Sequence, residues 1–445
     1  MGILALPALA RSVAFAQDED FRIYKDPPRL FLNQQRLRRL QRETTRDSLR
    51  WRQFSALAEG KAQFPEPGFA WALHYAASGN AGSAAAAVEW AMQPASQDLR
   101  QLALVYDWCL KILTPEQKSA IGAKLKAALT AASAGATADQ LRDQTLAAVT
   151  IAEAAPAESE KFLKDLVTRW WRKEIAPGLN TGKPALRREE LTALFEIMHV
   201  LQDNLKIDLR EDAPKFFKSL PAWHMLSHYP APLQTPENEF RVPVFTTNGE
   251  PDLRLAALSR AAELMMVAYD VNATESQFLQ GFLIQDRFLM RAPFGITYEF
   301  LWANPYQPGL PFEKMEPFFH DAVGGRFFVR SSWEEDSAWF GFFDGTMQSF
   351  SNGEIKVLQP ASFNKPIVFG NVIIMQGRED MKLDVNAEDG AHYFILGLGA
   401  NNSYDVEVDD EEMYEAVADA SGILSLSFPN GTKARAWVHK PGRGL

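Results

Sequence analysis

The feature that most constrains the fold is a change of sequence pattern near Pro293. From about residue 34 to 291, good helix formers dominate and alanine is dense. Within one segment, apolar side chains recur every three or four positions, at Leu99, Leu102, Tyr106, Cys109 and Leu113. This spacing places them on one face of a helix, and similar segments follow along the chain. We expect helices paired as antiparallel hairpins and packed in a ring or a solenoid.

After Pro293 the pattern becomes typical of β-structure. Residues 293–313 are rich in proline, glycine and aromatic side chains, as in a packed connection between domains. Short apolar runs then alternate with turn dipeptides such as Asn352-Gly353. We therefore expect a helical domain at about 22–315, followed by an antiparallel β-sheet or β-sandwich domain at 316–445.

The composition excludes several classes of protein. The 445 residues carry 46 Lys and Arg against 56 Asp and Glu, which gives a net charge of −10. Nucleic-acid-binding proteins usually have a basic excess, so no nucleic-acid partner is expected. No uninterrupted apolar stretch approaches the roughly 20 residues that span a bilayer, so no transmembrane segment is expected. The single cysteine, Cys109, excludes intramolecular disulfides, and its apolar neighbours predict a core position.

The first 17 residues have some features of a signal peptide. A short apolar stretch ends at Ala14-Phe15-Ala16, where small residues precede a polar segment, as at a cleavage site. The stretch lacks the usual N-terminal cation, and Arg11 interrupts it, so an ordinary frayed terminus is the alternative. We expect export, with a signal peptide at 1–17 and a periplasmic or secreted location.

Four stretches stand out between residues 27 and 345. They read PRLFLNQQRLRRLQRE, LALVYDWCLKILTPEQKSAI, the helix at 187–205 with the following NLKIDL, and GGRFFVRSSWEEDSAWFGFFDG. These stretches resemble segments of the heparinase II/III-like polysaccharide lyase family. The resemblance implies an incomplete (α/α) helical toroid followed by the β domain, and a polysaccharide or oligosaccharide rich in uronic acid as the partner.

The same resemblance directs attention to three places in the sequence. β-Elimination at a uronic acid needs a group that neutralises the substrate carboxylate, together with a base and an acid. The family resembled here uses an Asn or His in a mid-ring helix, a Tyr in the next helical layer and a His on the first β-hairpin. At the corresponding stretches this chain offers Asp143 and Gln144, then Glu189, then Gln348.

The resemblance thus implies Asp143, Gln144 and Gln348 as substrate-binding residues and Glu189 as a catalytic acid. A solvated helix start is the alternative for Glu189. Since Gln348 cannot take a proton at neutral pH, we expect weak or absent elimination activity.

A pair of histidines forms a further candidate site. His224 and His228 lie one helical turn apart, so they can face the same way. We interpret His228 and the adjacent Tyr229 as catalytic residues and His224 as a substrate-binding residue. The alternative is a helix end whose histidines form local hydrogen bonds. HMLSH lacks the Glu of a zinc-binding HExxH motif, so no metal site is expected, and the sequence identifies no cofactor.

A strongly basic segment lies near the start of the helical region. Between Arg36 and Arg52 there are seven arginines against two acidic residues. Arginine is suited to bidentate contact with carboxylates or sulfates. The spacing also suits the outer faces of two amphipathic helices, which is the interpretation we favour from the sequence.

The leading hypothesis is an exported carbohydrate-active protein similar to heparinase II/III-like lyases. One alternative is a non-catalytic glycan-binding or structural protein. A second is a glycosidase built on the same helical ring, which needs two carboxylates roughly 5–10 Å apart across a cleft.

Overall fold

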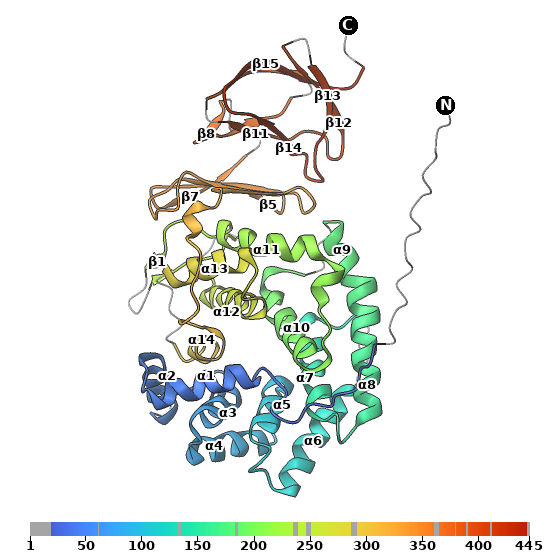
Figure 1. The fold of residues 1–445 in the computed structure, drawn as a ribbon, viewed down its shortest axis with the longest axis vertical. Coiled ribbons are helices and arrows are strands. Elements are labelled where there is room, and N and C mark those ends of the chain that lie inside the picture. Colours follow the sequence, from blue (N-terminus) through green and yellow to red (C-terminus); the bar gives the residue numbers. More distant parts are fainter. Residues whose placement is uncertain are drawn as a thin grey trace, which may run out of the picture.

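The protein is elongated, with helices at one end and stacked β-sheets at the other (Figure 1). This computed structural model describes residues 19–60, 62–130, 135–182, 186–234, 239–245, 251–285, 292–359, 365–378, 380–388, 390–409 and 412–442. The predicted signal peptide at 1–17 lies outside the described residues.

Helices extend from Gln34 to Trp302. The α-helices are α1 (Gln34–Thr45), α2 (Leu49–Glu59), α3 (Pro67–Ser78), α4 (Ala81–Met92), α5 (Leu99–Trp108), α6 (Pro115–Leu129), α7 (Ala138–Thr150), α8 (Pro156–Asp165), α9 (Ala176–Asn180), α10 (Leu191–Leu205), α11 (Pro214–Leu226), α12 (Leu253–Tyr269), α13 (Thr274–Gln285) and α14 (Ile296–Trp302). The π-helical segment η1 (Leu166–Ile175) continues α8, and the short 3₁₀ turns are η2 (Arg188–Glu190), η3 (Leu209–Asp212) and η4 (Phe312–Lys314).

Side-chain caps fix where many helices begin. A side-chain oxygen accepts a hydrogen bond from a first-turn backbone N–H at Asn33, Ser48, Asn80, Asp98, Thr114, Thr137 and Asp252. The capping box formed by Thr114 and Gln117, with Pro115 at the first helical position, is present as the sequence indicates.

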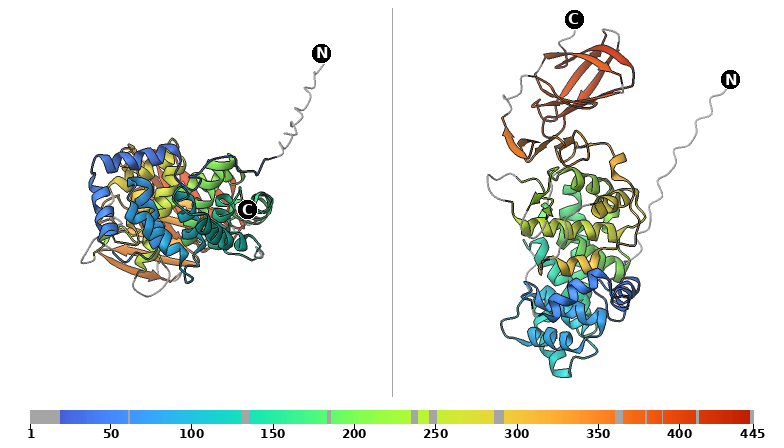
Figure 2. Two further views of the ribbon diagram at one scale, coloured as in Figure 1. Left: turned by 90° about the horizontal axis from the view of Figure 1, so that it is seen from below. Right: turned by 90° about the vertical axis from the view of Figure 1, so that its left-hand side faces the viewer.

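Six helices contact one another in a cyclic order. They are α3, α5, α7, α10, α12 and α14, and the last returns to α3. Other helices pack outside them, with α4 against α3, α6 against α5, α8 against α7 and α13 against α12. A single hydrophobic core joins these layers, and Cys109 lies in it, where burial raises the pKa of its thiol to about 12. Figure 2 shows the helical layers from two further directions.

In the described part of the chain, three β-sheets follow the helices. The first is the antiparallel sheet β3–β4–β5–β6–β7, which consists of β3 (Phe318–Asp321), β4 (Arg326–Arg330), β5 (Trp339–Phe343), β6 (Thr346–Ser351) and β7 (Glu354–Leu358). The middle sheet consists of β8 (Ile367–Phe369), β9 (Val372–Gln376), β11 (Ala391–Leu396) and β14 (Leu424–Phe428). The outer sheet consists of β10 (Asp380–Ala387), β12 (Ser403–Val408), β13 (Glu412–Val417) and β15 (Thr432–His439).

The predicted fold class, helices followed by β-sheets, is confirmed. The last α-helix ends at Trp302 and the first sheet begins at Phe318. Two details differ from the expectation. In the β domain, strands β9 and β11 pair in parallel and not antiparallel. In the helical region, a short hairpin of β1 (Leu233–Gln234) and β2 (Glu239–Phe240) interrupts the series of helices.

The middle sheet shares one core with each neighbouring sheet (Figure 1). On β11, Tyr393 and Ile395 pack into the core with the outer sheet, whereas Phe394 and Leu396 pack into the core with the first sheet. Alternate residues of a strand point to opposite faces, so an almost wholly apolar strand is the expected sequence for this position.

The first sheet also packs against the helices. The indole Nε1–H of Trp339 on β5 donates to the carbonyl oxygen of Leu226 at 2.9 Å, and Tyr229 packs with Phe328 and Phe350 in the same cluster. The first sheet therefore lies between the helical region and the other two sheets. This junction creates the cleft described below.

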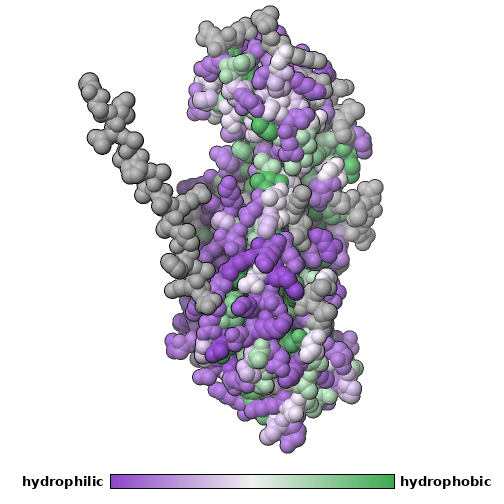
Figure 3. Space-filling view, turned by 90° about the vertical axis from the view of Figure 1, so that its right-hand side faces the viewer, coloured by the Kyte–Doolittle hydropathy of each residue, from purple (hydrophilic) through white to green (hydrophobic). Residues whose placement is uncertain are grey.

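The outer face of α8 and α9 is predominantly hydrophilic (Figure 3). Within the part of the chain that the structure describes, no helix combines the length and the apolar character that crossing a bilayer requires.

Candidate functional site

A cleft of about 790 Å³ lies where the helices meet the first sheet. Five parts of the described chain line it: residues 186–189 at η2, the end of α11, residues 242–245, the start of α12, and strands β4 and β5 with the turn after β5. Its charged and aromatic lining residues include Arg187, Arg188, Glu189, Trp223, Phe245, Asp252, Arg326, Phe343 and Asp344. Cations, carboxylates and aromatic rings thus share one cavity.

Arg188 is held rigidly in the wall of this cleft. Its Nε–H donates to Ser259 Oγ at 2.8 Å, and its Nη1 donates to Ser227 Oγ. Its Nη2 donates to Glu263 Oε1 at 3.1 Å and lies 3.4 Å from His228 Nε2. Burial lowers the pKa of Arg188 to about 10, against the opposing charge of Glu263, so the guanidinium is charged at neutral pH.

His224 and His228 do face the same way, because both lie next to Glu263, the carboxylate partner of Arg188. Neither is among the described residues that line the cleft. His224 Nδ1 is 3.0 Å from Glu263 Oε1, and His228 Nδ1 is 2.6 Å from the carbonyl oxygen of His224. Nδ1 of His228 therefore carries the proton, and its Nε2 lone pair faces Arg188. Burial lowers the pKa of His228 to about 3 and that of His224 well below its usual range. Both imidazoles are therefore neutral.

Tyr229 and Gln348 contact each other across the junction of helices and sheet. The Tyr229 hydroxyl donates to Gln348 Oε1 at 2.7 Å, and Gln348 Nε2 donates to the carbonyl oxygen of Phe245 at 2.8 Å. Both side chains are buried, and burial raises the pKa of Tyr229 to about 12. The pair joins the two parts of the chain beside the cleft.

Glu189 lies in the cleft wall and is about one-third exposed. Its Oε1 is 3.0 Å from Arg187 Nη1. Asp252 lines the same cavity and caps α12 through backbone N–H groups, and Asp344 lies 3.9 Å from Arg326. The cleft therefore contains carboxylates from three separate segments.

Asp143 and Gln144 lie in a different part of the helical region from the cleft. Asp143 pairs with Arg142 at 2.8 Å, and Arg142 adjoins the buried ion pair of Arg100 and Glu196. The Gln144 amide donates to the carbonyl oxygen of Ala128 at 2.9 Å. Neither residue lines the cleft, so their substrate-binding role stays a prediction that the cleft geometry does not support.

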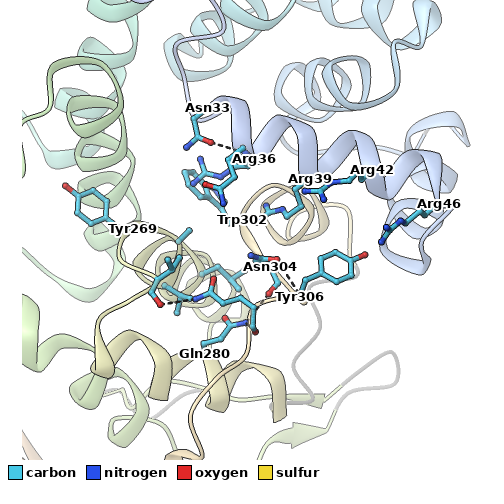
Figure 4. A pocket seen from close by; sticks show the side chains of 17 residues that line it. Asn33, Arg36, Arg39, Arg42, Arg46, Tyr269, Gln280, Trp302, Asn304 and Tyr306 are labelled. Carbon is cyan, nitrogen blue, oxygen red and sulfur yellow. Dashed lines mark hydrogen bonds between the residues drawn. The ribbon is translucent and has the colours of Figure 1, made fainter.

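The basic segment of α1 contributes to a second cavity, of about 590 Å³ (Figure 4). Arg36, Arg39, Arg42 and Arg46 line it. The outer-face interpretation therefore fits only part of the segment, such as the exposed Arg38. The regular spacing of these arginines was visible in the sequence, but the opposite wall of the cavity comes from residues more than 200 positions away.

No cluster of three or more potential metal ligands of the His, Cys, Asp or Glu type occurs among the residues described.

No protein-family model matches the chain, and no curated protein matches it. Among solved structures, a chain described as a glycoside hydrolase aligns with a TM-score of 0.33 and 8% sequence identity, covering 84% of this chain and 71% of that chain. A likeness at this level carries no argument about function. The resemblance to heparinase II/III-like lyases stays a prediction, and the functional argument rests on the geometry of the site.

Proposed function

We propose that the protein is carbohydrate-active and that its cleft binds an acidic saccharide. The observation that supports this most directly is the composition of one cavity of about 790 Å³, which combines a fixed arginine with aromatic side chains. Pockets for small ligands typically measure roughly 300–1,000 Å³ and combine apolar walls with a few placed polar groups.

Arg188 is the natural contact for a substrate carboxylate. Its contacts with Ser227, Ser259, Glu263 and His228 use four of the five N–H donors of a guanidinium. One Nη1–H is left for a ligand, and Arg188 lines the cleft. Because the network fixes the side chain in advance, little conformational entropy is lost when a carboxylate binds.

Aromatic side chains supply the complementary apolar surface. The Arg326 guanidinium lies over the ring of Trp223, with 4.7 Å between Cζ and the ring centroid. Phe245 and Phe343 line the same cavity. Sugar rings present C–H groups on their faces, and such faces pack against aromatic rings while hydroxyl groups bond to polar neighbours.

Binding can be tested with a uronate-containing disaccharide by titration calorimetry. We expect the acidic disaccharide to bind at least tenfold more tightly than its neutral counterpart, since a hydrogen bond to a charged group contributes about 1.5–3 kcal/mol. Leu255→Trp should weaken this binding, because Leu255 lines the cleft and is 44% exposed, so a larger side chain obstructs part of the cavity without replacing a residue of the Arg188 network.

The matched control is Leu49→Trp, which adds the same side chain at an exposed site on α2. Equal loss of binding in both variants, or equal affinity for the acidic and neutral disaccharides, would contradict the proposal.

Hydrolysis is a second candidate function, because Glu189, Asp252 and Asp344 all line the cleft. Elimination has less support. The Gln348 amide cannot act as a base, and the His228 lone pair faces the Arg188 guanidinium. On heparan, hyaluronan and alginate polymers we expect no increase in absorbance from unsaturated uronate products. New reducing ends that vanish in Glu189→Gln would favour a glycosidase, whereas robust formation of unsaturated product would show that a lyase site exists.

A further inference from the structure

The second cavity of the helical region is strongly cationic. Arg36, Arg39, Arg42 and Arg46 lie within about 120° of arc on α1, spread over about 15 Å of helix length. Figure 4 shows all four along one side of α1, facing Asn304 and Tyr306. We call this cavity the α1 groove.

Arg36 is buried and Arg39 is partly buried, and among the residues that the structure describes neither forms an ion pair. Arg36 is 7% exposed, and its guanidinium lies over the ring of Trp302 at 4.2 Å. Arg39 Nη2 donates to the carbonyl oxygen of Leu301 at 2.7 Å, and its buried Nε has no hydrogen-bond partner. Burial lowers the pKa of Arg36 to about 10 and that of Arg39 to about 9. Buried cations are costly unless an anion compensates them.

The charge of Asp203 raises the pKa of Arg36, and the charge of Glu43 raises that of Arg39, but burial outweighs both effects. The acidic residue of α1, Glu43, is buried and paired with Arg50 at 2.8 Å. No Asp or Glu occurs among the described residues that line the groove. The opposite wall instead presents amides and phenols, from Gln280, Asn304, Gln307, Tyr269 and Tyr306.

We propose that the α1 groove is a binding site for an acidic oligosaccharide chain, whose repeated carboxylate or sulfate groups contact the arginine row. A row of guanidinium groups fits a ligand with anions at regular intervals better than it fits one compact oxyanion. Tyr269 and Gln280 already donate to Asp208 and to backbone carbonyls, so Asn304, Gln307 and Tyr306 are the groups that can bond to sugar hydroxyl groups. The half-exposed Tyr306 also offers a ring face.

This site is separate from the cleft. Leu255 near the start of α12 lines the cleft, whereas Val267 near its end lines the α1 groove. Twelve residues of helix separate the two positions by about 18 Å. The inference therefore stands or falls independently of the proposed function.

The test is titration calorimetry of the full chain with a size-defined oligouronate hexamer and a sulfated glycosaminoglycan hexamer. The double variant Arg42→Glu/Arg46→Glu should weaken hexamer binding at least tenfold, because it reverses two exposed charges at the groove. Arg38→Glu makes the same kind of change on the exposed side of α1, away from the groove, and should stay within twofold of the wild type. Raising the salt concentration should weaken binding to the wild type more than to the double variant.

Leu255→Trp should leave this hexamer site intact, which distinguishes failure of the groove from failure of the cleft. Three results would overturn the inference: unchanged hexamer affinity in the double variant, equal loss in Arg38→Glu, or no hexamer binding in the wild type. Displacement of the hexamer by inorganic phosphate at equal concentration, or tighter binding of a single-stranded polynucleotide, would overturn the assigned ligand class.

Discussion

Replacing Glu196 by alanine is expected to lower the free energy of unfolding by about 3–5 kcal/mol. Glu196 is fully buried on α10 and accepts hydrogen bonds from Arg100 Nε at 2.9 Å and Nη2 at 2.6 Å. Arg142 Nε lies 3.6 Å from Glu196 Oε2, and Arg100 also pairs with Glu66 at 3.2 Å. Removing this carboxylate leaves Arg100 and Arg142 without their shared partner.

The size of this effect follows from the place of the network. Glu66 immediately precedes α3, while Arg100, Arg142 and Glu196 belong to α5, α7 and α10. Arg100 also lies over the ring of Tyr298 on α14, at 5.2 Å from its centroid. The network thus contacts five of the six helices that follow one another in cyclic order, and its loss should destabilise them together.

Urea unfolding followed by circular dichroism at neutral pH measures the effect. The control is Asp165→Ala, which breaks the exposed pair of Lys161 and Asp165 and should cost less than about 1 kcal/mol. The double variant Arg100→Met/Glu196→Leu removes both charges and should be more stable than Glu196→Ala, since apolar replacement of a buried pair is often tolerated. A cost below about 1 kcal/mol for Glu196→Ala would contradict this account.

Local sequence signals predicted much of the fold. The capping box at Thr114 and the change of pattern near Pro293 correspond to features of the structure. The expected helix at 98–113 ends at Trp108, so Cys109 and Leu113 lie beyond the end of α5. The parallel pairing of β9 with β11 was not predicted, because strand pairing depends on contacts between segments that a local pattern does not specify.

The residues in and around the cleft were harder to predict than the fold, because their environment also depends on contacts between distant segments. The one-turn spacing of His224 and His228 correctly indicated that they face the same way. Their shared environment is set by Glu263, more than 30 residues further along the chain, and by Arg188, about as far before them. Neither partner had a sequence signal. The row of arginines on α1 was visible in the sequence. The cavity that they line was not, because its opposite wall forms only when Asn304 and its neighbours fold against α1.

Lowering the pH from 7.5 to 5 is expected to destabilise the protein through its buried neutral histidines. The pKa of His228 is about 3 in the folded state, because burial and Arg188 disfavour the charged form more than Glu263 favours it. In the unfolded chain it returns to about 6.5. Below pH 6.5 the unfolded state therefore binds a proton that the folded state does not bind, and stability falls as the pH falls.

By pH 5 the loss from His228 alone amounts to about 2 kcal/mol. The pKa values of His224 and His199 are also lowered by burial, so they add to the loss in the same direction.

Paired urea titrations at the two pH values isolate the His228 contribution when the wild type is compared with His228→Gln. A glutamine can replace both hydrogen bonds of the neutral ring but does not titrate, so this variant should lose about 2 kcal/mol less than the wild type over the same interval. Phe282→Leu, which alters a ring packed near His228, should keep the wild-type difference. An identical pH dependence in the wild type and His228→Gln would mean that His228 is not held neutral in the folded protein.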